Sequence, residues 1–282
     1  MAVLPPRGQP AVMSHHIILP ISRREHRLAR SRRSSTLSLV LLGAMLTLGS
    51  AGPSRAEVSV DLLYDFRHTA DPQDNANNFP VVELKLFLPQ SFGSFLLKSE
   101  IDLDGANHNP SQTYTELTQS IKLGSATLLG QPLYLHLAYS GGLGSFGDGA
   151  GAFYIQNAWQ LGLEYPFQVD KAFCNASASL RYTSFEKPSY DPMITLYAGR
   201  FFLNYKLLLA NSLEAWTTSK DQGTTATQHD NGKYASWELE TEAWYKVGKD
   251  LSVGTYVRTT RNVYSVSDRW MVYPSVGVRY SF

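Results

Sequence analysis

The sequence predicts an all-β protein, an antiparallel up-and-down transmembrane β-barrel of about twelve strands. Three observations support this prediction: apolar and polar residues alternate in short runs, the connections between runs alternate in length, and the last run ends on an aromatic residue. Successive side chains of a strand point to opposite faces, so alternation gives each strand one apolar and one polar face. In an outer-membrane barrel the apolar faces meet lipid and aromatic rings lie at the membrane interface.

Residues 1–56 differ from the rest of the chain and predict a signal peptide. Six arginines between Arg23 and Arg33 precede an apolar stretch at residues 37–48, and the small residues Ser54 and Ala56 follow. The apolar stretch is too short to span a bilayer comfortably, and this order of segments is typical of a secretory signal. We expect cleavage after Ala56, which leaves a barrel domain of residues 57–282; the alternative is an uncleaved membrane anchor.

The barrel domain is acidic although the whole chain is almost neutral. Residues 1–56 hold eight of the 25 Lys and Arg residues and one of the 24 Asp and Glu residues, which leaves 17 basic and 23 acidic residues. This balance argues against nucleic-acid binding, which requires a basic surface. The single cysteine, Cys174, cannot form an intramolecular disulfide, so the fold must be held by its own ladders and packing.

Twelve runs after Ala56 are expected to form strands. In chain order they span residues 57–67, 81–88, 94–104, 111–123, 132–140, 152–165, 172–183, 193–202, 206–217, 233–245, 251–260 and 272–282. The eighth and ninth runs are ambiguous in face. For the other ten, the faces expected to meet lipid are Val58, Val60, Leu62, Tyr64 and Phe66; Val82, Leu84, Leu86 and Leu88; Phe95, Leu97, Ile101 and Leu103; Leu117, Ile121 and Leu123; Leu133, Leu135, Leu137 and Tyr139; Trp159, Leu161, Leu163 and Tyr165; Leu180 and Tyr182; Trp237, Leu239, Thr241, Ala243 and Tyr245; Val253 and Val257; and Val272, Val276, Val278, Tyr280 and Phe282.

The connections alternate in length along the chain. Longer ones follow the odd runs, at residues 67–79, 105–110, 141–151, 184–192, 218–232 and 261–269, and shorter ones mostly follow the even runs, at 90–93, 124–131, 166–171, 203–205 and 246–250. Short periplasmic turns and longer outer loops alternate in this way in outer-membrane barrels. A soluble β-sandwich also has alternating strands, with its apolar faces inside. The signal peptide, the terminal Phe282 and the aromatic residues near run ends favour the barrel.

In a barrel the polar faces line a lumen, and these faces carry the candidate solute-binding residues. The candidates are Asp61, Asp65, Glu83, Lys85, Lys98, Glu100, Glu116, Arg181, Glu238, Glu240, Tyr256 and Arg258, and the same faces also carry Asp102, Lys122, Glu164, Glu242 and Arg279. A buried charge is costly unless it is hydrated or paired. These residues therefore imply either a water-filled conduit or ion pairs that plug the lumen, and the sequence leaves both open.

Motifs for enzyme chemistry are poor in this chain. His136 has no serine two residues further on, as an outer-membrane phospholipase-like site would have, and we interpret it as a hydrogen-bonding residue of the lumen. The histidines His68, His108 and His229 lie singly, without the spacing of metal ligands. We expect no enzyme activity, no cofactor and no metal.

The barrel domain resembles the nucleoside-specific channel-forming superfamily of outer-membrane barrels, the Tsx-like group, and within it an uncharacterised bacterial branch. The matching segments are DLLYDF at 61–66, VELKLF at 82–87, KSEIDLDG at 98–105, YTELTQSIKL at 114–123, LAYSGGL at 137–143, QNAWQLGLEY at 156–165 and WMVYPSVGVRYSF at 270–282. The resemblance implies a monomeric twelve-stranded barrel and, for the classical members, passage of nucleosides. Glu83 and Glu116 stand where those channels have similar strand acids.

We therefore expect a channel for small polar solutes in the bacterial outer membrane. The alternatives are an outer-membrane enzyme that acts on lipid and a structural or surface-interaction barrel with a plugged lumen. The expected partners are the lipid bilayer, a small polar solute and the barrel assembly machinery, which would recognise the terminal strand with Phe282. We expect a monomer.

Overall fold

The computed structural model describes residues 56–105, 108–145, 152–184, 188–220, 232–263 and 269–282, so the predicted signal peptide up to Arg55 lies outside the described residues. The described chain forms twelve strands and one short helix. Their bounds are β1 (Glu57–Asp65), α2 (Arg67–Ala70), β2 (Phe79–Gln90), β3 (Gly93–Asp102), β4 (Gln112–Leu128), β5 (Gln131–Ser145), β6 (Ala152–Val169), β7 (Ala172–Thr183), β8 (Ser189–Phe202), β9 (Leu207–Ser219), β10 (Lys233–Lys246), β11 (Leu251–Arg261) and β12 (Trp270–Ser281).

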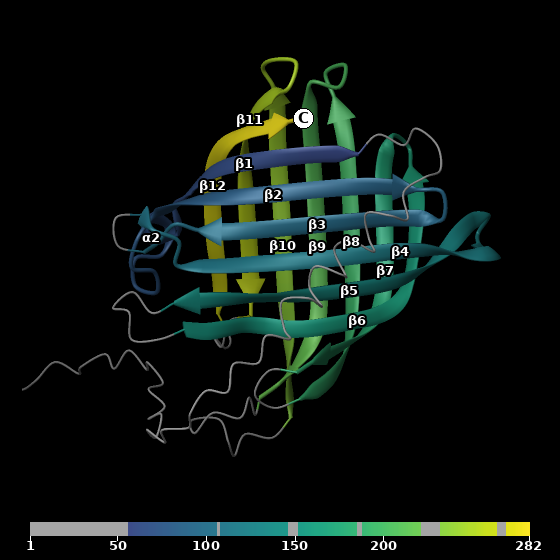
Figure 1. Cartoon of the computed structure of the whole chain (residues 1–282), viewed down its shortest axis with the longest axis horizontal. Helices are drawn as coiled ribbons and strands as arrows, with labels where there is room; N and C mark the ends of the chain where they lie inside the picture. The colour runs from purple at the N-terminus through teal and green to yellow at the C-terminus, as the bar shows by residue number, and fades with distance from the viewer. Residues whose placement is uncertain (1–55, 106–107, 146–151, 185–187, 221–231, 264–268) are drawn as a thin grey trace, which may run out of the picture. The chain divides into compact units, whose positions relative to one another are not determined.

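The strands close into a barrel. Every strand pairs antiparallel with its neighbours in sequence, and β1 also pairs with β12, so the sheet has no free edge. In Figure 1 the strands of the near wall cross those of the far wall, as expected when barrel strands tilt by about 35–45° from the barrel axis. The predicted up-and-down barrel of twelve strands is confirmed.

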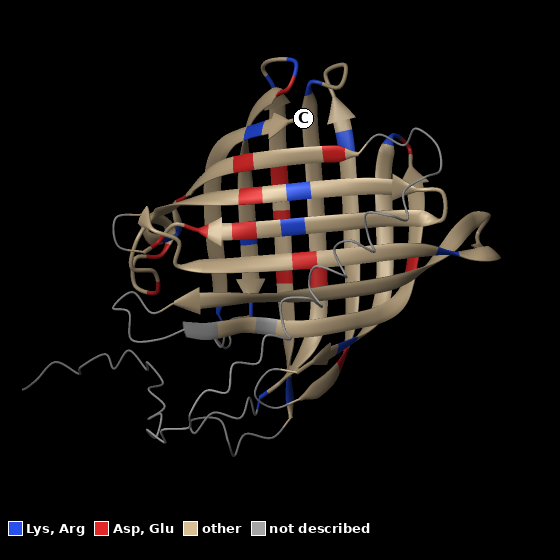
Figure 2. Ribbon diagram, in the orientation of Figure 1, with Lys and Arg blue, Asp and Glu red and all other residues tan. Residues whose placement is uncertain are grey.

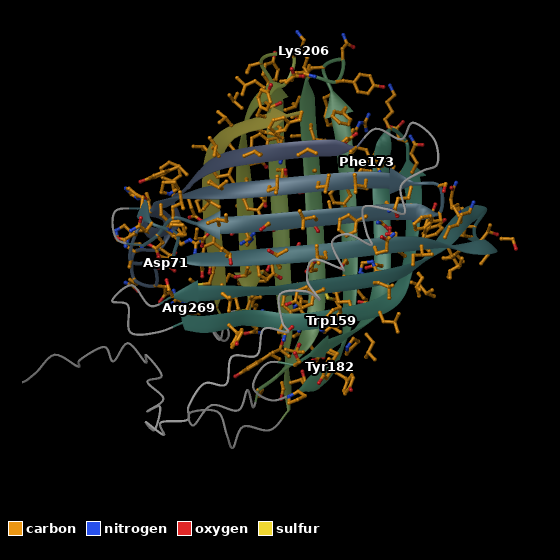
Figure 3. The ribbon with its side chains drawn as sticks, in the orientation of Figure 1. Asp71, Trp159, Phe173, Tyr182, Lys206 and Arg269 are labelled. Carbon is orange, nitrogen blue, oxygen red and sulfur yellow. The ribbon has the colours of Figure 1, made fainter. Side chains whose placement is uncertain are left out.

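The connections distinguish the two ends of the barrel. The end that carries α2 and the five other long connections is here called the loop end, and the end with the short turns is called the turn end. The side chains of Asp71 and Arg269 lie at the loop end and that of Lys206 lies at the turn end (Figure 3). The alternation read from the sequence is therefore confirmed, although the helix α2 was expected to be loop.

Four connections are shorter than predicted. β6 continues to Val169 through the turn expected at 166–171, and β8 begins at Ser189 within the loop expected at 184–192. Residues 124–131 were expected to form a turn, but β4 continues to Leu128 and β5 begins at Gln131, with a register shift between Lys122 and Thr127. Leu129 and Gly130 both have positive φ angles of 48° and 81°, which suits the tightest class of hairpin turn.

The predicted loop at 141–151 is also partly wrong, because β5 extends to Ser145. A β-bulge lies between Gly141 and Gly142, where β5 pairs with β6. A Cβ atom on Gly142 would lie 2.0 Å from the Thr113 carbonyl oxygen. These glycines therefore permit a close approach of backbones within a strand. Residues 146–151 lie outside the described residues.

The outer surface of the barrel is apolar. Leu62 is 53% exposed, Leu161 is 56% exposed and Leu196 is 46% exposed, whereas Asp61 and Glu83 on the opposite faces are each 1% exposed. Large apolar side chains therefore face outward and carboxylates face the interior. In a soluble sheet protein the apolar side chains face the interior and the charged ones face water. The soluble sandwich is thereby excluded for the described residues.

Aromatic rings mark the two boundaries of this apolar surface. Tyr139, Trp159, Tyr182 and Tyr190 are consecutive cross-strand partners on β5 to β8, and the labelled Trp159 and Tyr182 lie toward the loop end of the barrel wall (Figure 3). On β12, Trp270 and Tyr280 are both exposed, ten residues apart. Ten residues at about 3.4 Å each, tilted by about 45°, span about 24 Å, close to the roughly 25 Å apolar band of outer-membrane barrels.

No helix among the described residues has the length and apolar character needed to cross a bilayer. The closed barrel, its apolar exterior and its aromatic rings place the protein in the bacterial outer membrane.

Candidate functional site

The lumen of the barrel is lined by the polar faces of the strands. Figure 2 shows acidic and basic residues crossing the middle of β2 and β3, with further acidic positions on β10 in the far wall. The closed sheet turns every second residue inward, so charged residues from strands far apart in sequence meet in the lumen.

Ten charged side chains are joined in what we call the charge network. Its members are the carboxylates Asp61, Glu83, Glu100, Glu238, Glu240 and Glu242 and the cations Lys85, Lys98, Arg258 and Arg279. They belong to β1, β2, β3, β10, β11 and β12, which are contiguous in the ring of strands.

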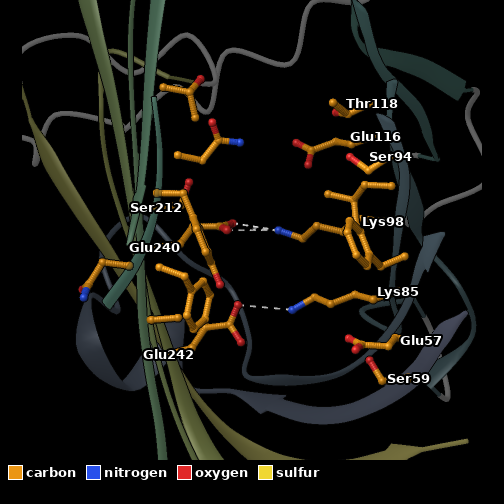
Figure 4. Close-up of a pocket in the computed structure, with 18 of the residues that line it drawn as sticks. Glu57, Ser59, Lys85, Ser94, Lys98, Glu116, Thr118, Ser212, Glu240 and Glu242 are labelled. Atoms are coloured by element: carbon orange, nitrogen blue, oxygen red, sulfur yellow. Dashed lines mark hydrogen bonds and ion pairs between the residues drawn. The ribbon is translucent and has the colours of Figure 1, made fainter. Parts of the chain in front are cut away.

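Two lysines bridge the lumen from wall to wall. Lys98 Nζ on β3 lies 2.9 Å from Glu240 Oε1 on β10, and Lys85 Nζ on β2 lies 3.2 Å from Glu242 Oε1. Figure 4 shows both lysines extending across the interior to these carboxylates. β3 and β10 are the two end strands of the network in the ring of strands. The lysine bridges therefore form a line across the lumen, here called the chord, which separates the network strands from β4 to β9.

Two arginines fill the space on the network side of the chord. Arg258 donates two hydrogen bonds to Glu100, of 2.7 Å and 3.3 Å, and Arg279 donates two to Asp61, of 2.8 Å and 2.6 Å. The Arg279 guanidinium also lies 4.0 Å from the centroid of the Trp244 ring. Paired, planar contacts of this kind are the strongest form of charged hydrogen bond.

The acidic face of β10 is matched by these cations. Glu238, Glu240 and Glu242 follow one another on one face, where like charges repel, and each has a cation within 3.4 Å. Glu240 also accepts hydrogen bonds from Lys98 and from the Tyr256 hydroxyl. The structure thus pairs Glu238 with Arg258 and Glu240 with both Lys98 and Arg258.

The loop end above the network is closed by Arg67 of α2. Its guanidinium lies 4.5 Å from the Phe79 ring centroid and 4.8 Å from that of Tyr273, and it donates to Asp65 at 2.7 Å. Burial alone would lower the pKa of Arg67, but the hydrogen bond and charge of Asp65 outweigh burial and hold the pKa above its usual value. Asp65 therefore belongs to this closure and lies apart from the network.

The other side of the chord contains a cavity of about 1130 Å³. Its wall includes lumen residues of β4 to β9, and it is also bordered by the network residues Lys85, Lys98, Glu238, Glu240, Glu242 and Arg279. It reaches the turn end, where Lys206 and Phe282 line it together with residues of β1 and β11. Tyr114, Tyr197 and Trp216 supply aromatic surface to this wall. The lumen thus has ion pairs gathered toward one side and a cavity that borders them and extends over the other side.

Carboxylates also project into this cavity. Glu116 on β4 points into the space beside Lys98 (Figure 4), and Glu214 on β9 is the direct cross-strand partner of Glu238. Among the described residues, neither Glu116 nor Glu214 has a hydrogen-bond or ion-pair partner. Two carboxylates of the cavity are therefore available to a solute.

Glu164 of β6 is satisfied by its neighbours. Its Oε2 atom accepts a hydrogen bond from Ser120 at 2.6 Å and lies 3.2 Å from His136 Nδ1, and its Oε1 atom accepts one from Asn175 at 2.8 Å. Ser120 donates to the carboxylate, and no hydrogen bond joins Ser120 to His136 in the described part of the chain. A serine nucleophile needs such a bond to its base, so the geometry gives no support to lipid hydrolysis at this position.

The structure gathers most of the candidate residues but not all of them. Nine of the twelve meet in or beside the charge network, namely Asp61, Glu83, Lys85, Lys98, Glu100, Glu238, Glu240, Tyr256 and Arg258. Glu116 and Arg181 line the cavity, and Asp65 lies at the loop end. Lys122 is exposed beyond the network near the turn end of β4.

Glu214 was absent from the candidates, and so was Asp191, which is fully buried and bonded to Ser189, Thr217 and Lys233. Glu214 lies on the ninth run, whose face was ambiguous, whereas Asp191 lies in the connection expected at 184–192, because β8 begins already at Ser189. No group of three or more His, Cys, Asp or Glu residues among those described is arranged to hold a metal ion.

Comparison with known proteins gives structural similarity only. No family of proteins matches the chain, and no curated protein matches it. Among solved structures it is similar to the KdgM porin in complex with disordered oligogalacturonate (15% identity, TM-score 0.44, covering 79% of this chain and 99% of that chain). It is also similar to the NanC porin (10% identity, TM-score 0.48, covering 80% and 100%) and to Salmonella typhi OmpF in complex with daunomycin (8% identity, TM-score 0.42, covering 81% and 97%).

Proposed function

We propose that this protein is an outer-membrane channel for small polar solutes. The observation that supports the proposal is the cavity of about 1130 Å³ beside the charge network, which is lined by both polar and apolar side chains and reaches the turn end. Polar groups on a pore wall can replace part of the hydration shell of a passing solute. The alternative is a purely structural barrel whose lumen is plugged by ion pairs. That alternative explains the charge network but does not explain the cavity beside it.

Nucleosides are the solute class to which the sequence resemblance points, and the cavity has features that suit them. Its volume of about 1130 Å³ lies just above the roughly 300–1,000 Å³ range of small-molecule sites, so it has room for a nucleoside. Tyr197 and Trp216 offer ring faces for a base, and stacking of a base on an aromatic ring contributes about 1–3 kcal/mol. Ser212 and Thr195 on the same wall offer hydroxyl groups for a sugar.

The proposal is tested with the purified mature barrel in planar lipid bilayers. We expect discrete single-channel conductance that falls when adenosine or uridine is added, because a solute in the cavity excludes ions. Trp216→Ala should weaken the effect of the nucleoside, whereas Trp159→Ala, on the lipid-facing surface, should leave it unchanged. A barrel that is correctly folded but electrically silent would overturn the channel proposal, and conductance insensitive to nucleosides would overturn only the choice of solute.

We also propose that the barrel is a monomer whose terminal strand is read by the barrel assembly machinery. In support, β12 closes the barrel against β1, the Phe282 amide donates to Val58 at 2.9 Å, and the Phe282 ring is 67% exposed. Phe282→Ala should lower the amount of folded protein recovered from outer membranes while refolding in detergent stays normal. Equal recovery in membranes would contradict this assignment.

A further inference from the structure

A row of hydrogen-bond acceptors runs around the inner wall of the cavity. Glu164, Ser177, Thr195, Glu214 and Glu238 are successive cross-strand partners on β6, β7, β8, β9 and β10. All five side chains line the cavity. We call this row the acceptor arc. With neighbouring strands about 4.8 Å apart, four intervals give the arc a length of about 19 Å.

The middle of the arc contains acceptor capacity that the protein itself does not use. Ser177 is 8% exposed and its Oγ atom is buried without a hydrogen-bond partner in the described chain. The Glu214 carboxylate, two positions along the arc, has no hydrogen-bond or ion-pair partner among the described residues. A buried polar atom without a partner costs free energy unless a ligand or water satisfies it.

Away from the turn end, where Lys206, Lys246 and Lys249 line the cavity, the charge of the surrounding lumen has the same sign as the arc. The charge network holds six carboxylates against four cations, so its ion pairs leave an excess of negative charge. Glu116, from the wall of β4, adds a further carboxylate to the cavity. Arg181 is the cation on the wall of β7, where it donates to Thr183 and stacks near Trp216. A cleft lined by an excess of one sign of charge concentrates counter-ions.

We propose that the acceptor arc binds the ammonium or guanidinium group of a small organic cation and gives the channel a preference for cations. This inference rests on the proposed channel function and narrows its solute class. The hydroxyl groups of Ser177 and Thr195 accept N–H donors, and the carboxyl group of Glu214, next to Thr195 in the row, supplies the opposite charge. The nearby Trp216 ring, over which the Arg181 guanidinium lies 5.4 Å from the centroid, shows that this wall holds a cation against an aromatic surface.

Two measurements on the folded mature barrel test the proposal. The first is the reversal potential across a bilayer with a tenfold gradient of KCl, where we expect potassium to permeate severalfold more readily than chloride. The second is titration of the barrel in detergent with arginine amide, followed by tryptophan fluorescence because Trp216 lies on the same face of β9 as Glu214. Glucuronate, an anion of similar size, serves as the matched probe and should not bind.

Three variants separate the arc from general effects of charge. Glu214→Gln keeps the shape of the side chain, and we expect arginine amide to bind about tenfold more weakly, as for loss of one charged hydrogen bond. Ser177→Ala should weaken binding by a smaller factor while leaving the net charge unchanged. Asp170→Asn removes a carboxylate that is 64% exposed and paired with Arg200 outside the cavity, and it should change neither measurement.

The outcomes distinguish failure of the inference from failure of the channel. A conducting barrel without cation preference, or one whose binding of arginine amide is the same in Glu214→Gln, overturns the acceptor arc and leaves the channel intact. Binding of arginine amide by a barrel that does not conduct overturns the channel function and supports the arc. If Glu214→Gln fails to fold, the Ser177→Ala variant decides the matter, and unchanged binding in it counts against the arc.

Discussion

The bridge between Lys98 and Glu240 offers a direct test of how dry the network side of the lumen is. Lys98→Met removes the charge at nearly constant shape, and Glu240→Gln removes its partner. At 2.9 Å, Coulomb's law gives an attraction of about 1.4 kcal/mol at the dielectric constant of water and about 6 kcal/mol at an effective value of 20. The two side chains are 12% and 17% exposed, so we expect a coupling free energy of about 2–4 kcal/mol.

The coupling is measured with a double-mutant cycle on the free energy of unfolding. The wild-type barrel, both single variants and the double variant are unfolded in urea from lipid vesicles, and the four values give the coupling. We expect the stability losses of the two single variants to add up to more than the loss of the double variant. Each single variant leaves one buried charge without its partner, whereas the double variant removes both charges. The pair Arg200–Asp170, 3.0 Å apart and largely exposed, is the control and should couple by less than about 1 kcal/mol.

A coupling between Lys98 and Glu240 no larger than that of the control would refute the reasoning. It would mean that water screens the bridge as fully as it screens a surface pair. The chord would then not divide the lumen, and the cavity would have to be redrawn to include the network side.

Three further predictions concern other parts of the barrel. Leu196→Arg, on the lipid-facing surface of β8, should destabilise the barrel in vesicles by about 2–4 kcal/mol near the bilayer centre. Thr195→Arg on the lumen side should cost less stability, and equal losses would contradict the assigned faces. Leu129→Asn should raise the urea midpoint by an amount equivalent to about 0.5–1 kcal/mol. Leu129 has a φ of 48°, and asparagine tolerates this left-handed backbone conformation better than leucine does. A lower midpoint would argue against the turn. Arg67→Ala should cost about 2–3 kcal/mol of stability, because Asp65 is 3% exposed and loses its partner; an unchanged midpoint would show that the closure at the loop end contributes nothing.

Much of this fold follows from the alternation of residues along the chain. Leu62, Leu84 and Val278 were expected to face lipid and are exposed, and Glu83 was expected to face the lumen and is enclosed. The reason is physical: in a closed sheet with lipid outside, one side of each strand must be apolar along its whole length. Strand number and the alternation of longer and shorter connections follow from the same pattern.

The partners across the lumen could not be read from the sequence in the same way. Lys98 and Glu240 are 142 residues apart, and Lys85 and Glu242 are 157 residues apart. Which lumen residues meet depends on the tilt and stagger of the strands, which alternation does not encode. Glu214 was missed for a different reason: the residues Leu207, Leu208, Leu209 and Ala210 are all apolar, so the start of β9 has no period of two to reveal its face.

The uneven placement of cations explains why one barrel contains both a sealed side and a hollow side, and it suggests a final perturbation. All four cations of the charge network lie on β2, β3, β11 and β12, which join through β1, and their bonds reach Glu240 and Glu242 on β10. Of the carboxylates in the acceptor arc, Glu238 is within that reach and pairs with Arg258, whereas Glu164 and Glu214 have no ion pair with the network in the described chain.

Thr195→Lys would supply the missing cation beside Glu214, its direct cross-strand partner. The new ammonium should pair with that carboxylate, reduce the preference for potassium over chloride in the KCl gradient and abolish binding of arginine amide. Thr195→Val, which fills similar space without charge, is the control and should retain the cation preference. If both variants keep the same selectivity as the wild-type barrel, the charge at the arc does not govern what the lumen admits.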